Sequence, residues 1–382
     1  MNIQEMNTHA PSRPSKVLHL TYRTMGEEPI VENIKEVIID HTSLREVDMP
    51  YRPFEALREV NTNGHTYKVG LLEAMLNNPD AANILRQDIR MLAFSALNSM
   101  PRSFAGVTDF ISSDNPEESY LRDAAIGVLT PAPSGTEAPR VKTGFEGDAN
   151  IPNVLYRAIV EILGDWILFD KIGKIRQVSQ EMGLSGRLTE EAVVWAYLTT
   201  TGNYTRNSTT NDNDKGANTS TLTFSADGLR TAKATVTTAK DRKSGAYLGY
   251  MPDAIWGAPQ MEVPFLQLLT SPELQRAHGA TTAEAIGTGT RNPFFGMIRK
   301  VILSPWIGSS FQWGLCDSTR GGFKFQTVEN FNVFQQSANP IDSEAWRRLD
   351  ILEYLIRGYF GVGFVDDRAW FFSDSTTDAT VS

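Results

Sequence analysis

The stretch LIRGYFGVGFVDDRAWFF, residues 355–372, decides the fold of this chain. It reads either as a glycine-rich cofactor loop or as a strand whose glycines serve packing. Apolar residues or glycine occupy every second position leading into and through it, which is the period of a β-strand. These positions are Leu352, Tyr354, Ile356, Gly358, Phe360, Val362 and Phe364. We therefore predict one long strand whose glycines mark bends or close backbone approach, then a turn at Asp366 and Asp367, then a final short strand.

A cofactor loop fits this stretch poorly. A dinucleotide fingerprint needs a helix directly after its glycines and an acidic residue about 20 positions further on. Only 19 residues follow Gly363, which leaves no room for a helix and then a second strand with that acidic residue. A second glycine string, Gly287 and Gly289, follows a threonine-rich stretch and precedes Asn292 and Pro293, so it lacks a strand before it and a helix after it. We expect no cofactor at either place.

The composition excludes several classes of protein. At 41% hydrophobic residues, the 382-residue chain can bury a sizeable core. Its formal net charge of −9 argues against general affinity for nucleic-acid backbone, because phosphate contacts need concentrated lysine and arginine. Cys316 is the single cysteine, so an intrachain disulfide and a multi-cysteine zinc site are excluded. The sequence has no signal-peptide pattern and no apolar run of about 18 residues that would predict a membrane span.

The first half of the chain alternates helical and extended patterns. Apolar spacing predicts a helix within residues 81–100, closed by Pro101. Residues 127–165 are broken by proline and glycine and predict an extended, hairpin-like excursion that is ordered only by packing on a partner surface, often another copy of the chain. Residues 170–200 are helical. The pattern leaves open one long helix with a weak point near Gly183, or two helices, the second capped by Thr189.

The second half begins with a polar stretch. Residues 199–220 are so rich in Thr, Ser, Asn, Asp and Gly that we predict a long exposed loop. Ser225 is predicted to cap the next helix, and the patterns beyond it predict an α+β segment with a mainly antiparallel sheet. Its predicted parts are a strand at 252–257, a helix at 260–271, a loop at 279–293, a strand at 297–304, and strands at 311–316 and 323–328 joined through a turn.

Residues that could carry chemistry are scattered. The histidines are His9, His19, His41, His65 and His278. They indicate no Ser-His-Asp or Cys-His centre, and no metal-ligand spacing or phosphate loop occurs. The adjacent acidic pairs are Glu117–Glu118, Glu190–Glu191 and Asp366–Asp367. Because neighbouring side chains diverge on a helix or strand, we interpret such pairs as solvated faces or helix starts. We predict no catalytic, cofactor-binding or metal-binding residue, and a protein that is not an enzyme.

The order of segments resembles a known family. A polar arm, an extended two-stranded loop, a spine-like helix, an α+β domain and a long aromatic-rich terminal strand resemble the major capsid proteins of tailed bacteriophages, those with the Hong Kong 97-type fold. The resemblance covers roughly residues 110–374. It is carried by SDNPEESYLRDAAIGVL (113–129), IGKIRQVSQEMG (172–183), PDAIWGAPQMEVPFLQLLTSPEL (252–274) and WRRLDILEYLIRGYFGVGFVDDRAWFF (346–372).

The resemblance implies an α+β fold and a domain arrangement. The implied parts are an N-terminal arm and helical segment at 1–110, a peripheral domain with the spine helix at 111–126 and 166–200, an extended loop at 127–165, an axial domain at 201–344, and a long terminal peripheral strand with its return to the axial domain at 345–382. Some members of the family join subunits covalently through a lysine of the extended loop. Lys142 lies in that loop, but nothing in the sequence indicates such a bond.

The resemblance also implies a function. The chain would be a structural subunit that self-assembles as hexamers and pentamers into the icosahedral head shell of a tailed bacteriophage. The shell would enclose double-stranded DNA without sequence-specific binding, with portal, scaffolding or decoration proteins as partners and no membrane. The expected location is the virion, after assembly in the host cytoplasm, with the N-terminal arm retained in the shell.

Two alternatives remain open at this point. The same fold builds encapsulin-like nanocompartments, and DNA or cargo protein inside purified particles would separate the two shells. The length of the chain before the extended loop favours the phage head. A soluble carboxylate-dependent hydrolase belongs to another class, and particles of megadalton mass would exclude it.

Overall fold

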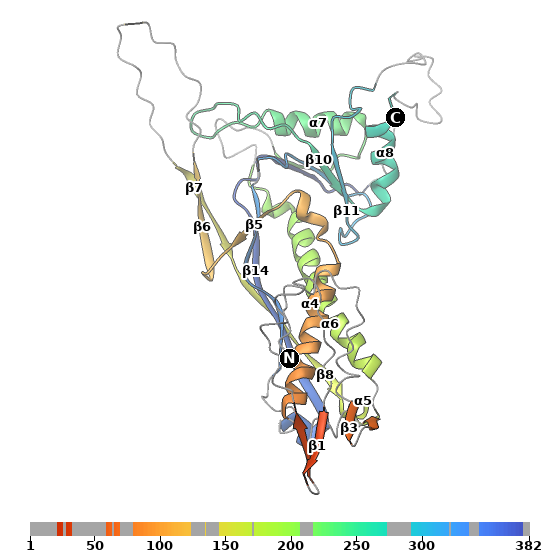
Figure 1. Cartoon of the computed structure of the whole chain (residues 1–382). Coiled ribbons are helices and arrows are strands. Elements are labelled where there is room, and N and C mark those ends of the chain that lie inside the picture. The colour runs from red at the N-terminus through yellow and green to blue at the C-terminus, as the bar shows by residue number, and fades with distance from the viewer. Residues whose placement is uncertain are drawn as a thin grey trace. The chain divides into compact units, whose positions relative to one another are not determined.

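The computed structural model describes the chain in segments (Figure 1). The described residues are 21–25, 28–32, 59–62, 65–68, 79–123, 134, 145–169, 172–206, 217–272, 292–320, 322–335 and 344–376.

The helices of these segments include three short 3-10 turns. They are α4 (Pro79–Ser99), η3 (Ser103–Gly106), α5 (Gly164–Leu168), α6 (Ile172–Leu198), η4 (Thr201–Asn203), α7 (Ala226–Thr237), η5 (Pro259–Met261), α8 (Glu262–Thr270) and α9 (Glu344–Leu349).

The strands run from the first described residues to nearly the last. They are β1 (Thr21–Met25), β2 (Glu28–Glu32), β3 (Glu59–Thr62), β4 (His65–Lys68), β5 (Asp109–Ser112), β6 (Glu117–Asp123), β7 (Phe145–Pro152), β8 (Val154–Leu163), β9 (Thr219–Ser220), β10 (Ala254–Gly257), β11 (Lys300–Leu303), β12 (Trp313–Cys316), β13 (Phe323–Gln335), β14 (Ile351–Phe364) and β15 (Trp370–Ser373).

The chain divides into two compact units. Unit 1 draws on residues 1–100, 157–186 and 331–357, and unit 2 on residues 101–156, 187–330 and 358–382. The long elements α6, β8, β13 and β14 contribute residues to both.

β14 is the strand predicted from the opening stretch. Its first part alternates buried and half-buried residues, as the period of two requires. The alternation changes at Gly361 and Gly363, which are both buried. A Cβ on Gly361 would lie 2.5 Å from the carbonyl oxygen of Pro152, and one on Gly363 would lie 2.8 Å from the side chain of Ile151. The glycines therefore permit close backbone approach, which confirms the prediction.

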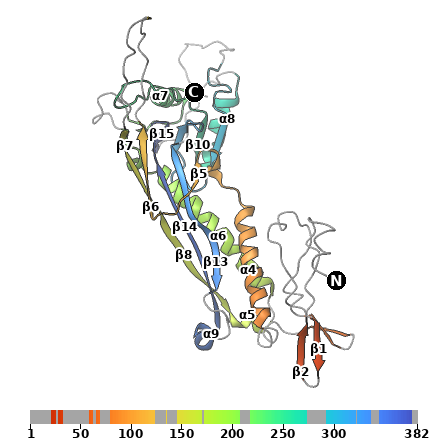
Figure 2. The same cartoon turned by 60° about the vertical axis from the view of Figure 1, so that its left-hand side comes forward.

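Two larger sheets organise the strands of the described segments. One has the order β5–β13–β14–β8, and Figure 2 shows β13, β14 and β8 running side by side. The other has the order β11–β10–β12–β15–β9. In the second sheet β12 pairs antiparallel with β10 and β15, while β11 and β9 pair parallel with their neighbours. The prediction of a mainly antiparallel sheet is thus right for only half of these pairs.

The turn after β12 does not close a hairpin, contrary to the prediction for strands 311–316 and 323–328. β12 belongs to the five-stranded sheet and β13 to the four-stranded one. Gly322 lets the chain pass from the five-stranded sheet to the four-stranded one, because it adopts a φ of 105° and packs against the carbonyl of Asp366, where any Cβ would clash. A non-glycine residue rarely adopts that backbone conformation.

In unit 1, α4 packs on α6. The two helices approach so closely at Ala93 and Gly183 that a Cβ on Gly183 would overlap the Ala93 carbonyl. α4 confirms the helix predicted before Pro101. α6 is one continuous helix that passes through Gly183 and Thr189, which decides between the two alternatives. Close packing on α4 compensates the low helix propensity of glycine at this point.

The core of unit 2 is built from aromatic side chains. Trp256 stacks on Phe372 with ring centroids 5.6 Å apart, and Phe224 meets Phe265 edge to face at 4.7 Å. Such pairs add about 0.5–1.5 kcal/mol each beyond their area burial. α7 lies at the periphery of this unit (Figure 1) and starts at the predicted cap, where Ser225 Oγ accepts a hydrogen bond from Gly228 N at 3.0 Å.

The polar stretch 199–220 is only partly the exposed loop that we predicted. Residues 207–216 lie outside the described segments. On either side of them Tyr204, Arg206 and Asn218 are buried, and β9 joins the five-stranded sheet. The prediction is wrong for these residues because hydrogen bonds compensate much of the cost of burying polar groups, and the Asp367 carboxylate accepts from both Arg206 N and Asn218 Nδ2.

Candidate functional site

The terminal turn of unit 2 carries a network of buried polar contacts. Asp367 is fully buried, and its carboxylate accepts hydrogen bonds from the backbone N–H groups of Thr205 and Arg206 at 2.5 and 3.1 Å. It also accepts from the Thr205 hydroxyl at 2.9 Å and from Asn218 Nδ2 at 3.1 Å. Arg122 lies 3.8 Å away. One carboxylate thus ties both sides of the polar stretch to the end of β14.

Asp366 points to different partners. Its carboxylate accepts from Arg368 Nε and Nη2 at 2.9 and 2.8 Å, and from the Tyr250 hydroxyl at 2.8 Å. Burial by itself would raise the pKa of Asp366, but the hydrogen bonds and positive charge of Arg368, with the charge of Arg122, hold that pKa below its ordinary value. The two adjacent carboxylates therefore serve separate structural contacts and do not share a proton.

The β6–β7 hairpin is attached to this turn through its strands. β6 and β7 pair antiparallel from Glu117↔Pro152 to Asp123↔Phe145. Arg122 donates from Nε and Nη2 to the Val365 carbonyl at 2.9 and 2.5 Å. The hairpin starts ten residues before the predicted excursion of 127–165. Residues 154–163 of that range form β8 of the four-stranded sheet, and residues 164 and 165 begin α5. Residues 124–133 and 135–144 between the two strands, Lys142 among them, lie outside the described segments.

Polar side chains fix the base of the hairpin. Asn153 Nδ2 donates to Ser113 Oγ and the Asn115 carbonyl, at 3.1 and 2.7 Å. Glu118 accepts from Ser113 and Asn115 at 2.8 and 2.9 Å. Further along, Gln326 Nε2 donates to a carbonyl of β7 at 2.7 Å. The hairpin therefore leaves unit 2 from a fixed root.

The Glu190–Glu191 pair is buried in unit 2, so its interpretation as a solvated face or helix start is wrong. Glu190 binds Arg102 through two N–H···O contacts, at 2.8 and 3.0 Å, and also pairs with Arg187. Glu191 accepts from the backbone N–H and hydroxyl of Ser103 at 2.6 and 2.5 Å. The pair joins the 3-10 turn η3 to α6. Arginine and hydroxyl partners compensate the cost of burying both charges.

Asp88 of α4 is a second buried carboxyl, in unit 1. Neither of its oxygens has a hydrogen-bond partner among the described residues. Burial raises the pKa of Asp88 to about 8, an effect that the positive charge of Arg176 only partly offsets. The carboxyl is therefore largely protonated near neutral pH, within the apolar stripe where α4 meets α6.

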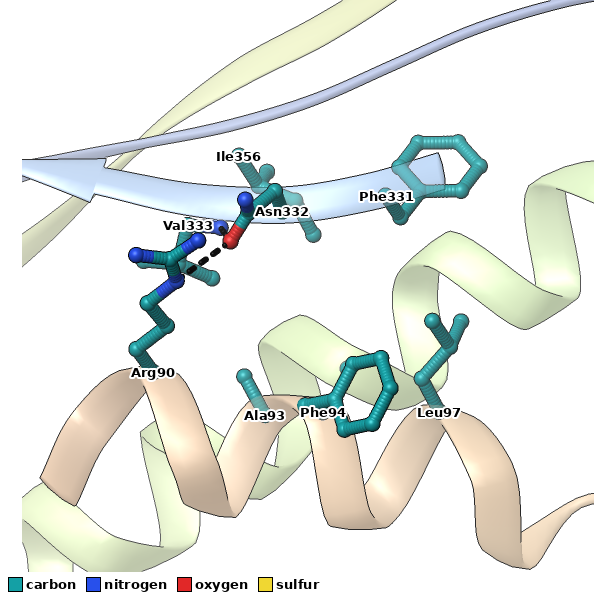
Figure 3. A pocket seen from close by; sticks show the side chains of 9 residues that line it. Arg90, Ala93, Phe94, Leu97, Phe331, Asn332, Val333 and Ile356 are labelled. Atoms are coloured by element: carbon teal, nitrogen blue, oxygen red, sulfur yellow. Dashed lines mark hydrogen bonds between the residues drawn. The ribbon is translucent and has the colours of Figure 1, made fainter. Parts of the chain in front are cut away.

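A shallow groove in unit 1 runs between α4 and β13 (Figure 3). Arg90, Phe94 and Leu97 line the helix side, and Phe331 and Asn332 line the strand side. Its polar pair is already joined, since Arg90 Nε donates to Asn332 Oδ1 at 2.8 Å. The groove suits an apolar side chain better than a polar ligand.

Other predicted positions contribute no reactive site within the described segments. Cys316 is buried in β12. His9, His19, His41, His278, Gly287 and Gly289 fall outside the described residues. Where side chains are described, no group of three His, Cys, Asp or Glu is arranged to hold a metal ion. No described helix combines the length and apolarity needed to cross a bilayer.

Comparisons with known proteins identify the family. The family model described as "Phage capsid protein" matches residues 156–372, more than half of the chain. A search of curated proteins finds no match.

Solved structures match this chain at low identity. A chain of Mycobacterium phage Cain is 10% identical with a TM-score of 0.44, covering 74% of this chain and 87% of that one. A chain from the procapsid of bacteriophage JBD30 is 15% identical with a TM-score of 0.41, covering 79% and 77%. A chain of the virus-like particle from Pyrococcus furiosus is 11% identical with a TM-score of 0.42, covering 75% and 98%.

Proposed function

Since the chain belongs to the phage capsid protein family and is a shell-forming subunit of a phage head, we propose that it assembles as hexamers and pentamers into an icosahedral shell around double-stranded DNA. The family match over residues 156–372 carries this proposal. The mixed helix-and-sheet fold agrees with the predicted Hong Kong 97-type class.

The β6–β7 hairpin supports assembly with other copies. A two-stranded ribbon has no core of its own and is marginal in water unless it packs on another surface. Leu121 on β6 is more than half exposed, although the root of the hairpin is firmly bonded to the terminal turn. The hairpin would bury such apolar surface on a neighbouring subunit in the shell.

Exposed apolar side chains elsewhere offer further contacts. Large exposed examples are Phe94, Phe169, Met251, Val263, Phe295 and Leu349. A closed shell repeats each contact in every subunit, so contacts that are individually modest give a stable particle. The assignment of 127–165 to an extended loop, of 201–344 to an axial domain and of the flanking ranges to a peripheral domain belongs to this proposal.

The proposal also includes the assembly pathway. Shells form in the host cytoplasm with portal, scaffolding or decoration proteins as partners and become part of the virion. The net charge of −9 supports an inner wall to which packaged DNA does not adhere. Two of the three acidic pairs that a hydrolase could use are engaged in structural contacts instead: Glu190 and Glu191 with η3, Asp366 and Asp367 around the terminal turn.

Electron microscopy of the purified protein, after size-exclusion chromatography, tests the proposal. We expect closed particles of megadalton mass, with pentameric and hexameric capsomers visible in averaged images. A small oligomer that forms no shell under any assembly condition would overturn it. Analysis of particles isolated from infected cells decides the cargo: DNA supports the phage head, and a packaged enzyme supports the nanocompartment alternative.

A further inference from the structure

β8 forms one edge of the four-stranded sheet. It pairs with β14 on one side, and among the described residues no strand pairs with its other side. An edge strand of ten residues presents a row of unpaired backbone N–H and C=O groups, which is a template for pairing with another strand. Proteins commonly protect such edges with proline, lysine or a bulge, and β8 contains neither proline nor lysine.

The two faces of β8 differ. On the inner face Ile162 is buried, and Tyr156 stacks on Phe360 of β14 with ring centroids 4.6 Å apart. The outer face carries alternating apolar and charged residues. It comprises Leu155, Arg157, Ile159, Glu161 and Leu163. The three apolar members are 46%, 53% and 44% exposed, in chain order. Arg157 and Glu161 have no ion-pair or hydrogen-bond partner among the described residues.

This outer face is self-complementary about Ile159. If two copies of β8 pair antiparallel with Ile159 opposite Ile159, Arg157 of each copy faces Glu161 of the other, and Leu155 faces Leu163. Residues directly opposite on one face of an antiparallel pair lie about 4.5–5.5 Å apart, and opposite charges there are stabilising. We propose that β8 is a two-fold contact, in which its free edge pairs with β8 of a second copy around Ile159.

A second copy is the occupant that the pattern favours. A contact around a two-fold axis uses the same surface patch on both subunits, so it requires a patch that complements itself. The order apolar, positive, apolar, negative, apolar along β8 meets this requirement. Pairing with an unrelated strand would not require β8 to be self-complementary. The inference rests on the proposed self-assembly, because an icosahedral shell contains two-fold axes. One strand edge is a small interface, so we expect it to form mainly within the shell.

Disulfide trapping tests the pairing. In Ile159→Cys the two introduced thiols would face each other across the axis, and directly opposite Cα atoms about 4.5–5.5 Å apart meet the geometry of a disulfide. The native Cys316 is buried, so it adds little background. Purified shells are oxidised, and their subunits are then separated by denaturing gel electrophoresis without reductant. We expect most Ile159→Cys subunits to run as covalent dimers.

Glu161→Cys is the matched control, on the same strand and the same exposed face. In the proposed register it lies opposite Arg157, so two Glu161→Cys thiols are displaced by four residues, about 13 Å along the strand. We expect no dimer from this variant. Equal dimer formation by both variants, or none from Ile159→Cys in intact shells, overturns the pairing and leaves the proposed function standing.

Charge exchange provides an independent readout. Arg157→Glu and Glu161→Arg each place like charges opposite one another twice at the axis, and we expect each to lower shell yield at least about fivefold. The double variant restores opposite charges and is expected to recover yield to within about twofold of the parent. Failure of the double variant to recover overturns the register. If the parent forms no shells, the proposed function fails, and oxidation of concentrated subunits still decides whether β8 pairs.

Discussion

Replacing Asp367 with alanine should destabilise unit 2 more than any single exposed change. The substitution removes four hydrogen-bond acceptances at once. Thr205 is exposed, so water can rehydrate its groups, but the Arg206 N–H and the Asn218 amide are buried and would lose their carboxylate partner. Each buried unsatisfied donor costs about 1–3 kcal/mol, and removing one member of a buried charged network costs about 3–5 kcal/mol. We expect a loss of about 3–5 kcal/mol.

Denaturant unfolding of the unassembled subunit, followed by tryptophan fluorescence, measures this loss, since Trp370 lies three residues from the substitution. Asp227→Ala is the control, because Asp227 forms a largely exposed ion pair with Arg230 and such pairs contribute about 0–1 kcal/mol. Asp367→Ala should also assemble into few shells. A loss below about 1 kcal/mol, equal to that of the control, would refute the reasoning that Asp367 holds the polar stretch.

Two further predictions concern the α4–α6 contact of unit 1. Gly183→Ala should lower the unfolding free energy by at least about 1–3 kcal/mol, because its Cβ would overlap the Ala93 carbonyl. The control is Gly173→Ala, in the same helix with open space around it, which should be neutral or stabilising. Equal effects of the two substitutions would contradict the close packing at Gly183. Asp88 ionises near pH 8 when folded and near pH 4 when unfolded, so the native state binds the proton more tightly and stability should fall as pH rises between them. The melting temperature of the parent protein should therefore fall between about pH 4 and pH 8, and Asp88→Asn should show a smaller fall. A parent protein whose melting temperature does not fall over this range would refute the reasoning.

The sequence predicted the elements whose residues repeat regularly. The period of two in β14, the helical spacing of α4 and the Ser225 cap are local signals, and all three are confirmed. The interpretation of Gly361 and Gly363 as points of close approach was also local, since a strand tolerates glycine only for such a reason. The likeness to capsid proteins rested on the order of these elements.

What the sequence could not predict depends on distant partners. Glu190 is buried because Arg102, 88 residues earlier, meets it, and no local pattern signals that distance. Asp367 is buried for the same kind of reason. One signal was available for it: a charged group between Phe364 and the apolar run from Ala369 must either be exposed or find partners. The membership of β12 and β13 in different sheets likewise depends on Gly322 and its tertiary contact.

The place of β15 has a consequence for folding during synthesis. In the order β11–β10–β12–β15–β9, this strand lies between β12 and β9, although it is the last of the five to be translated. β9 is made about 150 residues earlier, and its described strand partner is β15 alone. The sheet therefore cannot close on a ribosome-bound chain that lacks residues 370–373. Because this long-range pairing is slow to form, nascent chains would keep this sheet open until residues 370–373 have been translated, which delays contact between subunits until β15 has been made.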